Sequence, residues 1–167
     1  MTEDQLFQTI LADTYTLTDF HRRLKLLRDY LENTFFTEER QSLSDFFKKH
    51  QISTSDLEIL VAWGDNFYQS FAQENIYKIL RNLEEKAKNL PIVTVYLPIA
   101  INSLLPYQIG KWFRQNLEYA VLIDLKTDYS LVSGAAVVCK GIYHDFSLHY
   151  YISKQKEEIL NIISNYK

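Results

Sequence analysis

The sequence predicts an α+β fold, in which an N-terminal helical bundle is followed by a small α/β C-terminal domain with a β-hairpin and a terminal helix. Up to residue 90 the chain contains one glycine, Gly64, and no proline, and its apolar residues recur at helical spacing. At Pro91 the pattern changes to short β-branched and aromatic runs bounded by proline and glycine. A chain of 167 residues has room for two small domains, which we assign to 1–90 and 91–167.

Capping patterns and apolar spacing predict the first helices in chain order. Thr2 and Gln5 have the spacing of a capping box, which opens the first helix. The second helix is predicted by apolar residues at i, i+4, i+7 and i+11 from Phe20, and Thr37 is expected to cap the third. The residues expected to face the core of these three helices are Leu6, Phe7, Ile10, Leu11, Phe20, Leu24, Leu27, Leu31, Leu43, Phe46 and Phe47.

The rest of the first domain is also predicted to be helical. Ser55 and Glu58 have the spacing of a second capping box, which predicts a fourth helix with Leu57, Leu60 and Val61 facing inward. Gly64 is expected to break the chain after this helix. One long helix with inward-facing residues from Phe67 to Leu83 is expected to follow.

The second domain is predicted to begin with a strand over 92–97, which is closed by Pro98. Ser103 is expected to open a helix that tolerates Pro106 because this residue falls in the first turn. A second strand is expected over 119–125, followed by a turn at 126–128. The helix between the strands is expected to turn inward Leu105, Ile109, Trp112, Phe113 and Leu117.

The C-terminal part is predicted to be a hairpin and a helix. Residues 134–140 and 142–146 flank Gly141, whose positive φ would allow a tight turn. The last helix is indicated by Leu148, Ile152, Ile159 and Ile163 at helical spacing.

Composition and charge argue against several classes of function. The chain carries 18 basic and 21 acidic residues, and neither 1–90 (net −4) nor 91–167 (net +1) has the basic surplus of a nucleic-acid binder. We predict no catalytic, cofactor-binding or metal-ligating residues, since the glycines are scattered and the histidines lack a metal-ligand pattern. Cys139, the one cysteine, lies in an apolar run and is expected to be buried and unreactive; an enzyme with a Cys139 nucleophile is a remote alternative.

The N-terminus is acidic where a signal peptide would be basic, and no apolar run of about 18 residues is present. We therefore expect a cytosolic protein that inserts no segment into the membrane but could sit on a membrane assembly through a protein partner.

Tyrosines gather in the C-terminal part of the sequence. Tyr143, Tyr150 and Tyr151, together with His149 and with Tyr129 nearby, are denser there than a small core requires. Tyrosine suits protein interfaces because it is rigid, largely apolar and able to form hydrogen bonds. We predict a partner interface at Tyr143, His149, Tyr150 and Tyr151; ordinary packing is the alternative.

The segment from Asp128 to Ser147 has a distinctive pattern of polar residues and glycines around an apolar run. It resembles the C-terminal signature of the delta subunit (OSCP) of F-type ATP synthases, which has Asp-Pro-Ser-Leu-Ile-Gly-Gly, an apolar run, a turn glycine and Asp-x-Ser before a final helix. The residues that match in kind and spacing are Asp128, Ser130, Leu131, Gly134, Gly141, Asp145 and Ser147. Tyr129 replaces the proline and Ser133 the first glycine, while His149 and Tyr151 stand where the family usually has arginine.

The resemblance extends over about residues 60–160 and implies a non-catalytic stator subunit without cofactors. Such a subunit would link the catalytic head to the peripheral stalk, so that ion flow is coupled to ATP synthesis. The helical domain would bind alpha subunits of the head, and the second domain would bind the b-type stalk subunit. The residues by themselves leave an alternative open, a stand-alone adaptor that binds a peptide or helix in another assembly. Independently of the resemblance, turn and cap chemistry predicts scaffold roles for Asp128, Ser130, Asp145 and Ser147.

Overall fold

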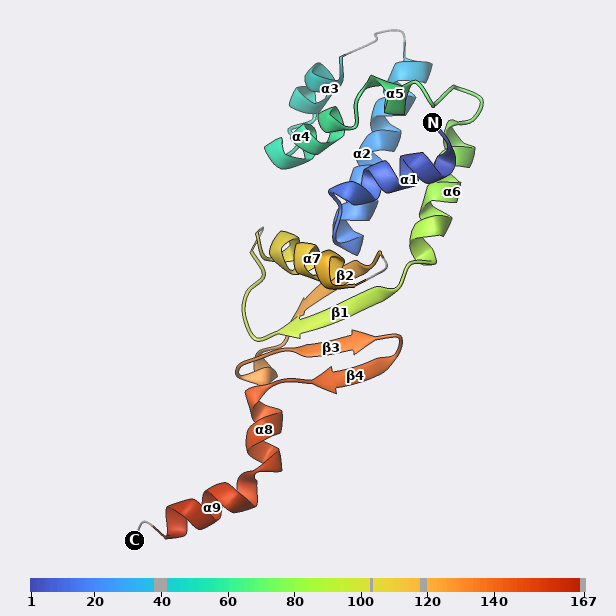
Figure 1. The fold of residues 1–167 in the computed structure, drawn as a ribbon. Helices are drawn as coiled ribbons and strands as arrows, with labels where there is room; N and C mark the ends of the chain where they lie inside the picture. The colour runs from blue at the N-terminus through green and yellow to red at the C-terminus, as the bar shows by residue number, and fades with distance from the viewer. Residues whose placement is uncertain (38–41, 103, 118–119, 166–167) are drawn as a thin grey trace. The chain divides into compact units, whose positions relative to one another are not determined.

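The computed structural model describes residues 1–37, 42–102, 104–117 and 120–165. The chain divides into two compact units, the helical unit (Met1–Leu90) and the sheet unit (Pro91–Lys167). The division falls where the pattern of apolar residues changes in the sequence. The predicted α+β class is confirmed, because helices precede a four-stranded mixed sheet that is followed by C-terminal helices (Figure 1).

The helical unit is built from short and medium-length helices. Its described helices are α1 (Glu3–Ala12), α2 (Leu17–Phe36), α3 (Leu43–Lys49), α4 (Thr54–Ala62), α5 (Asp65–Tyr68) and α6 (Ile76–Lys88). The predicted capping box at Thr2 and Gln5 is confirmed, with both reciprocal hydrogen bonds present. Gly64 has φ of 74° and separates α4 from α5, which confirms the predicted break.

Three predicted boundaries in this unit are wrong. Thr37 ends α2, and Ser42 caps α3 instead, with its side chain accepting from the Asp45 amide. Ser53, not Ser55, caps α4, because the Asp56 amide donates to its hydroxyl. The long helix expected after Gly64 is divided into α5 and α6 by a turn in which Asn75 Oδ1 accepts from the Ala72 amide.

The core of the helical unit consists of the predicted faces of the helices. Its largest fully buried side chains are Phe20, Phe47, Phe67, Leu6, Ile10, Leu24, Leu27, Leu31, Leu60, Ile76, Leu80 and Leu83. Val61 was expected to face this core but is 51% exposed, because the buried face of α4 is centred on Asp56 and Leu60. Burial of large apolar side chains from every helix of the unit supplies its main stabilisation.

The sheet unit combines a parallel and an antiparallel part. Its described elements are β1 (Ile92–Leu97), α7 (Leu105–Asn116), β2 (Leu122–Thr127), η1 (Tyr129–Leu131), β3 (Ala136–Cys139), β4 (Ile142–Asp145), α8 (Leu148–Lys154) and α9 (Lys156–Ser164). The strand order is β2-β1-β3-β4, with β1 parallel to β2 and antiparallel to β3. The parallel pair needs a crossover connection, which α7 provides.

One face of the sheet and α7 enclose a small core (Figure 1). The core is formed by Val93, Val95, Val121 and Ile123, against which α7 packs Ile109 and Phe113. Trp112 was predicted to face inward but is 57% exposed, because it lies about 100° around the helix from Phe113, which packs on the core. Pro106 lies in the first turn of α7, as predicted.

Two boundaries in this unit also differ from the prediction. The second strand continues to Thr127, because the expected turn residues Lys126 and Thr127 pair with β1. The single terminal helix is two helices, α8 and α9, separated at Gln155. Ser103 and Tyr119, where a helix and a strand were expected to begin, lie outside the described residues.

The hairpin about Gly141 is confirmed. Lys140 and Gly141 have φ values of 50° and 76° and form the two-residue connection between β3 and β4. Positive φ at both positions matches the right-handed twist of a hairpin. Among the described helices, none is long and apolar enough to cross a membrane.

Candidate functional site

The signature segment begins with a turn that joins β2 to the short helix η1. The Asp128 carboxylate accepts hydrogen bonds from the Ser130 amide at 3.0 Å and from the Ser130 hydroxyl at 2.6 Å. These bonds lower the pKa of Asp128. Leu131 is buried at the end of η1, so the turn is anchored on one side by an apolar side chain.

Gly134 allows two segments of the signature to approach closely. Its φ is 86°, and a Cβ atom there would lie 2.3 Å from the carbonyl oxygen of Phe146. Two hydrogen bonds between backbone groups flank this approach: Phe146 N donates to Ala135 O at 2.9 Å, and Leu148 N donates to Ser133 O at 2.9 Å. A side chain at Gly134 would therefore separate the start of β3 from the start of α8. Gly141, by contrast, has open space around the position of a Cβ atom.

The signature ends in the cap of α8. Ser147 is fully buried, and its hydroxyl accepts from the Tyr150 amide at 3.1 Å. The Asp145 carboxylate accepts from the Ser147 amide at 2.8 Å, and hydrogen bonds from Ser147 lower the pKa of Asp145. These contacts fix the direction in which α8 leaves the sheet. The signature residues thus act on the backbone of their own segment.

The predicted interface residues are all exposed, but they do not form one cluster. Tyr150 and Tyr151 lie on α8 with their ring centroids 5.7 Å apart, 43% and 49% exposed, and His149 is next to them. Tyr143 lies on β4, where burial together with Asp145, Asp128 and Tyr96 raises its pKa. Within the described part of the chain, no ring contact joins Tyr143 to Tyr150 or Tyr151.

Helices α8 and α9 present an apolar surface that the sequence analysis did not predict. Neither helix contains a buried residue. Their large exposed apolar side chains are Leu148, Tyr150, Tyr151, Ile152, Leu160, Ile162 and Ile163, which we call the C-terminal apolar surface. The helical spacing of Leu148, Ile152 and Ile163 predicts a helix, but periodicity alone does not distinguish a face that packs within the chain from one that binds a partner.

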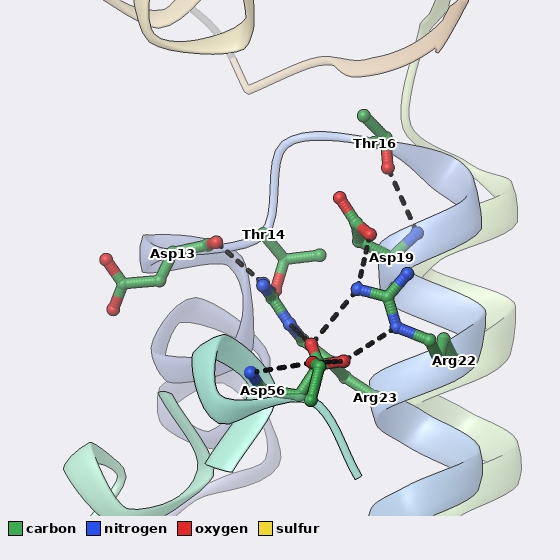
Figure 2. A network of polar contacts seen from close by, with 8 residues as sticks. Asp13, Thr14, Thr16, Asp19, Arg22, Arg23 and Asp56 are labelled. Carbon is green, nitrogen blue, oxygen red and sulfur yellow. Dashed lines mark hydrogen bonds and ion pairs between the residues drawn. The ribbon is translucent and has the colours of Figure 1, made fainter. Parts of the chain in front are cut away.

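The helical unit contains a buried network of ion pairs that the sequence analysis missed (Figure 2). Asp56 is 2% exposed and accepts from Arg22 Nε at 2.8 Å and from Arg23 Nε at 3.0 Å. Arg23 also donates to the carbonyl oxygen of Asp13 at 2.7 Å and to the Thr14 hydroxyl at 2.8 Å. The network therefore ties the start of α4 to α2 and to the connection between α1 and α2.

Asp56 remains charged because its partners compensate for its burial. Burial by itself would raise the pKa of this carboxyl, but hydrogen bonds from Arg22, Arg23 and Ser53 lower it below its ordinary value. In the sequence, a signal for the network is that Arg23 falls on the apolar face that Phe20 and Leu27 define. A buried arginine requires an anionic partner, although its identity depends on the tertiary fold.

A hollow of about 600 Å³ lies beside α1 in the helical unit. Its lining residues are Met1, Asp4, Gln5, Gln8, Thr9, Trp63 and Asn66. Trp63 ends α4 and is 7% exposed, and its indole nitrogen has no hydrogen-bond partner among the described residues. The lining therefore combines a nearly buried indole ring with the carboxylate of Asp4, which is ion-paired with Lys86.

Cys139 is less buried than predicted. It lies at the end of β3 and is half-buried, in contact with the sheet core. Its hairpin partner Ile142 is exposed, so this corner of the sheet is only partly covered. Among the described residues, no group of three or more histidine, cysteine, aspartate or glutamate side chains could hold a metal ion.

The sequence matches no protein-family model and no curated protein.

Proposed function

We propose that the protein is a non-catalytic subunit of the peripheral stalk of an F-type ATP synthase, similar to the delta subunit (OSCP). The observation that carries the proposal is the signature from Asp128 to Ser147. Its turn, close approach, hairpin and helix cap form one continuous scaffold that directs α8. In a stator subunit, such a scaffold would present a rigid helix to the stalk.

The sheet unit would bind the b-type stalk subunit through the C-terminal apolar surface. An amphipathic stalk helix could bury its apolar face against α8 and α9, whose large apolar residues stay exposed in the described chain. Tyr150 and Tyr151 would supply rigid aromatic contacts. The unit carries a net charge of only +1, so this binding should depend weakly on salt.

The helical unit would bind N-terminal segments of the alpha subunits. Its net charge of −4 favours a basic amphipathic peptide. The hollow beside α1 is lined by polar side chains and by Trp63, and Asp4, which is ion-paired with Lys86, would add an acidic contact for such a peptide. This binding should weaken as salt screens the charges. The subunit would then be peripheral to the membrane, on its cytoplasmic side, and held there through its partners.

The experiment is to purify the tagged full-length chain from its native cells and to identify the subunits that accompany it by mass spectrometry. We expect alpha and b-type subunits with the unaltered chain. Tyr150→Ala combined with Tyr151→Ala should lose the b-type subunit and keep alpha. The matched control is Tyr107→Ala, which changes an exposed tyrosine on α7 and should keep both partners. Absence of every ATP synthase subunit from the unaltered sample would refute the proposal.

A second candidate is an adaptor that binds a helix in another assembly. The exposed apolar faces of α8 and α9 favour a helical partner without specifying an ATP synthase. In that case the same purification would recover one different partner, whose loss in the Tyr150 and Tyr151 variant would identify the surface.

A further inference from the structure

The outer edge of β2 lies at one end of the sheet and takes no part in the proposed function. Strand β2 is the last strand of the sheet on its side and pairs only with β1. Across the described residues, no backbone group hydrogen-bonds to its outer edge. An unpaired strand edge presents a row of N–H and C=O groups that can pair with another strand.

The side chains of β2 indicate which strand fits this edge. Asp124 and Lys126 lie two residues apart and therefore on the same face of the strand. They form an ion pair of 3.2 Å, and Lys126 Nζ also lies 5.9 Å from the centroid of the Tyr96 ring. Leu125 lies between them on the other face, partly buried against the sheet core. Opposite charges thus flank an apolar residue at the centre of the strand.

We propose that β2 pairs with β2 of a second copy of this chain, antiparallel and centred on Leu125. In that register Asp124 faces Lys126 of the second copy, and Lys126 faces Asp124, so two opposite-charge pairs form across the edge. The two Leu125 side chains meet at the twofold axis and join the cores of the two sheets. Such an interface is isologous, which means that the same surface serves both copies.

The charges of Asp124 and Lys126 favour the register centred on Leu125 over the registers centred on the adjacent residues. Centring the pair on Asp124 would oppose two carboxylates, and centring it on Lys126 would oppose two ammonium groups. Directly opposite like charges destabilise an antiparallel pair, whereas opposite charges stabilise it. A single lysine on an edge strand usually prevents pairing. Here Asp124 neutralises Lys126 of the second copy in the one register that the proposal names.

The test measures self-association of the full chain by sedimentation velocity over a wide range of concentrations at low salt. We expect a weak dimer that dissociates as salt is added. Asp124→Lys and Lys126→Asp each place like charges opposite one another, so each variant alone should dimerise about tenfold more weakly. Circular dichroism verifies that each variant remains folded.

Two complementary experiments separate pairing from a general effect of the substitutions. An equal mixture of Asp124→Lys and Lys126→Asp should form a heterodimer, because every lysine then faces an aspartate. The double variant Asp124→Lys with Lys126→Asp should dimerise like the unaltered chain. A chain that stays monomeric at all concentrations would overturn the proposal. So would single variants that dimerise undiminished, since the dimer would then use another surface.

Discussion

The helical unit and the sheet unit differ in how completely they bury their own side chains. The helical unit covers apolar residues from every helix and also a network of ion pairs around Asp56. The sheet unit places one helix, α7, on one face of its sheet, and its last two helices bury nothing. The comparison teaches that the helical unit buries apolar side chains from each of its described helices, whereas the sheet unit retains apolar surface that a partner would cover.

The largest expected effect is a loss of stability of the helical unit when one of its buried charges is removed. Asp56→Asn leaves the buried guanidinium of Arg23 without a compensating charge, so we expect a loss of about 3–5 kcal/mol in the free energy of unfolding. The measurement is urea unfolding followed by the fluorescence of Trp63 in a Trp112→Phe background. Asp19→Asn removes the more exposed partner of Arg22 and should cost about 1 kcal/mol or less. Equal losses in the two variants would mean that burial does not matter here.

In the sheet unit, the largest single effect is expected at Gly134. Gly134→Ala combines a positive φ with a Cβ that would collide with the Phe146 carbonyl, and should cost about 2–3 kcal/mol. Gly141→Ala has the same kind of φ without the collision and should cost only about 1 kcal/mol. Hydrogen exchange of the β1 and β3 amides measures the stability of the sheet unit in both variants. If they were equally destabilised, the close approach at Gly134 would not be the cause.

A fall in pH is expected to reduce the stability of the helical unit gradually. The pKa of Asp56 is lower in the folded helical unit than in the unfolded chain, where it is about 3.9. Its contribution to stability is therefore fully present above about pH 4 and is lost as the pH falls through the folded-state value. Acid titration followed by Trp63 fluorescence should show this loss, and the Asp56→Asn variant should lack it. An identical acid profile in that variant would assign the loss to other carboxylates.

The smallest effect on stability is expected in α9. Ile162→Gln and Ile163→Gln change exposed residues, so each should alter the free energy of unfolding by about 0.5 kcal/mol or less. The matched substitution in the helical unit, Leu80→Ala, removes a fully buried side chain and should cost about 2–5 kcal/mol. Binding of a stalk peptide to the full chain should nonetheless weaken in the α9 variants. A large loss of stability there would show that α9 packs within the protein.

Local patterns predicted much of the fold. The buried faces of α1 and α2 follow from apolar spacing, and the hairpin follows from Gly141. The predicted cap residues of α3 and α4 were wrong because several serines and threonines near the start of each helix could occupy the N-cap position. Ser53 caps α4, so that Asp56 lies in the first turn of the helix, where it accepts hydrogen bonds from Arg22 and Arg23. That selection depends on a contact with α2, which no local pattern contains.

The candidate sites likewise divide into those that a local sequence pattern predicts and those that depend on the tertiary fold. The bonds of Asp128 with Ser130, and of Asp145 with Ser147, join residues two apart, so turn chemistry predicts them. The hollow beside α1 brings together residues from distant parts of the chain, including Trp63 and Gln8, and has no local signal. The C-terminal apolar surface was visible as a helical pattern, but only the structure showed that its residues stay exposed in the described chain.

The central position of β1 has a consequence for biosynthesis. Both of its neighbours, β2 and β3, come later in the chain. On the ribosome the helical unit can fold first, since domains generally fold as units from the N-terminus. The apolar segment Ile92–Leu97 then emerges with both edges unpaired, and one edge stays open until β3 has been synthesised. Such a segment is prone to aggregate while it is exposed, so the interval between synthesis of β1 and β3 is when the nascent chain most needs chaperone protection.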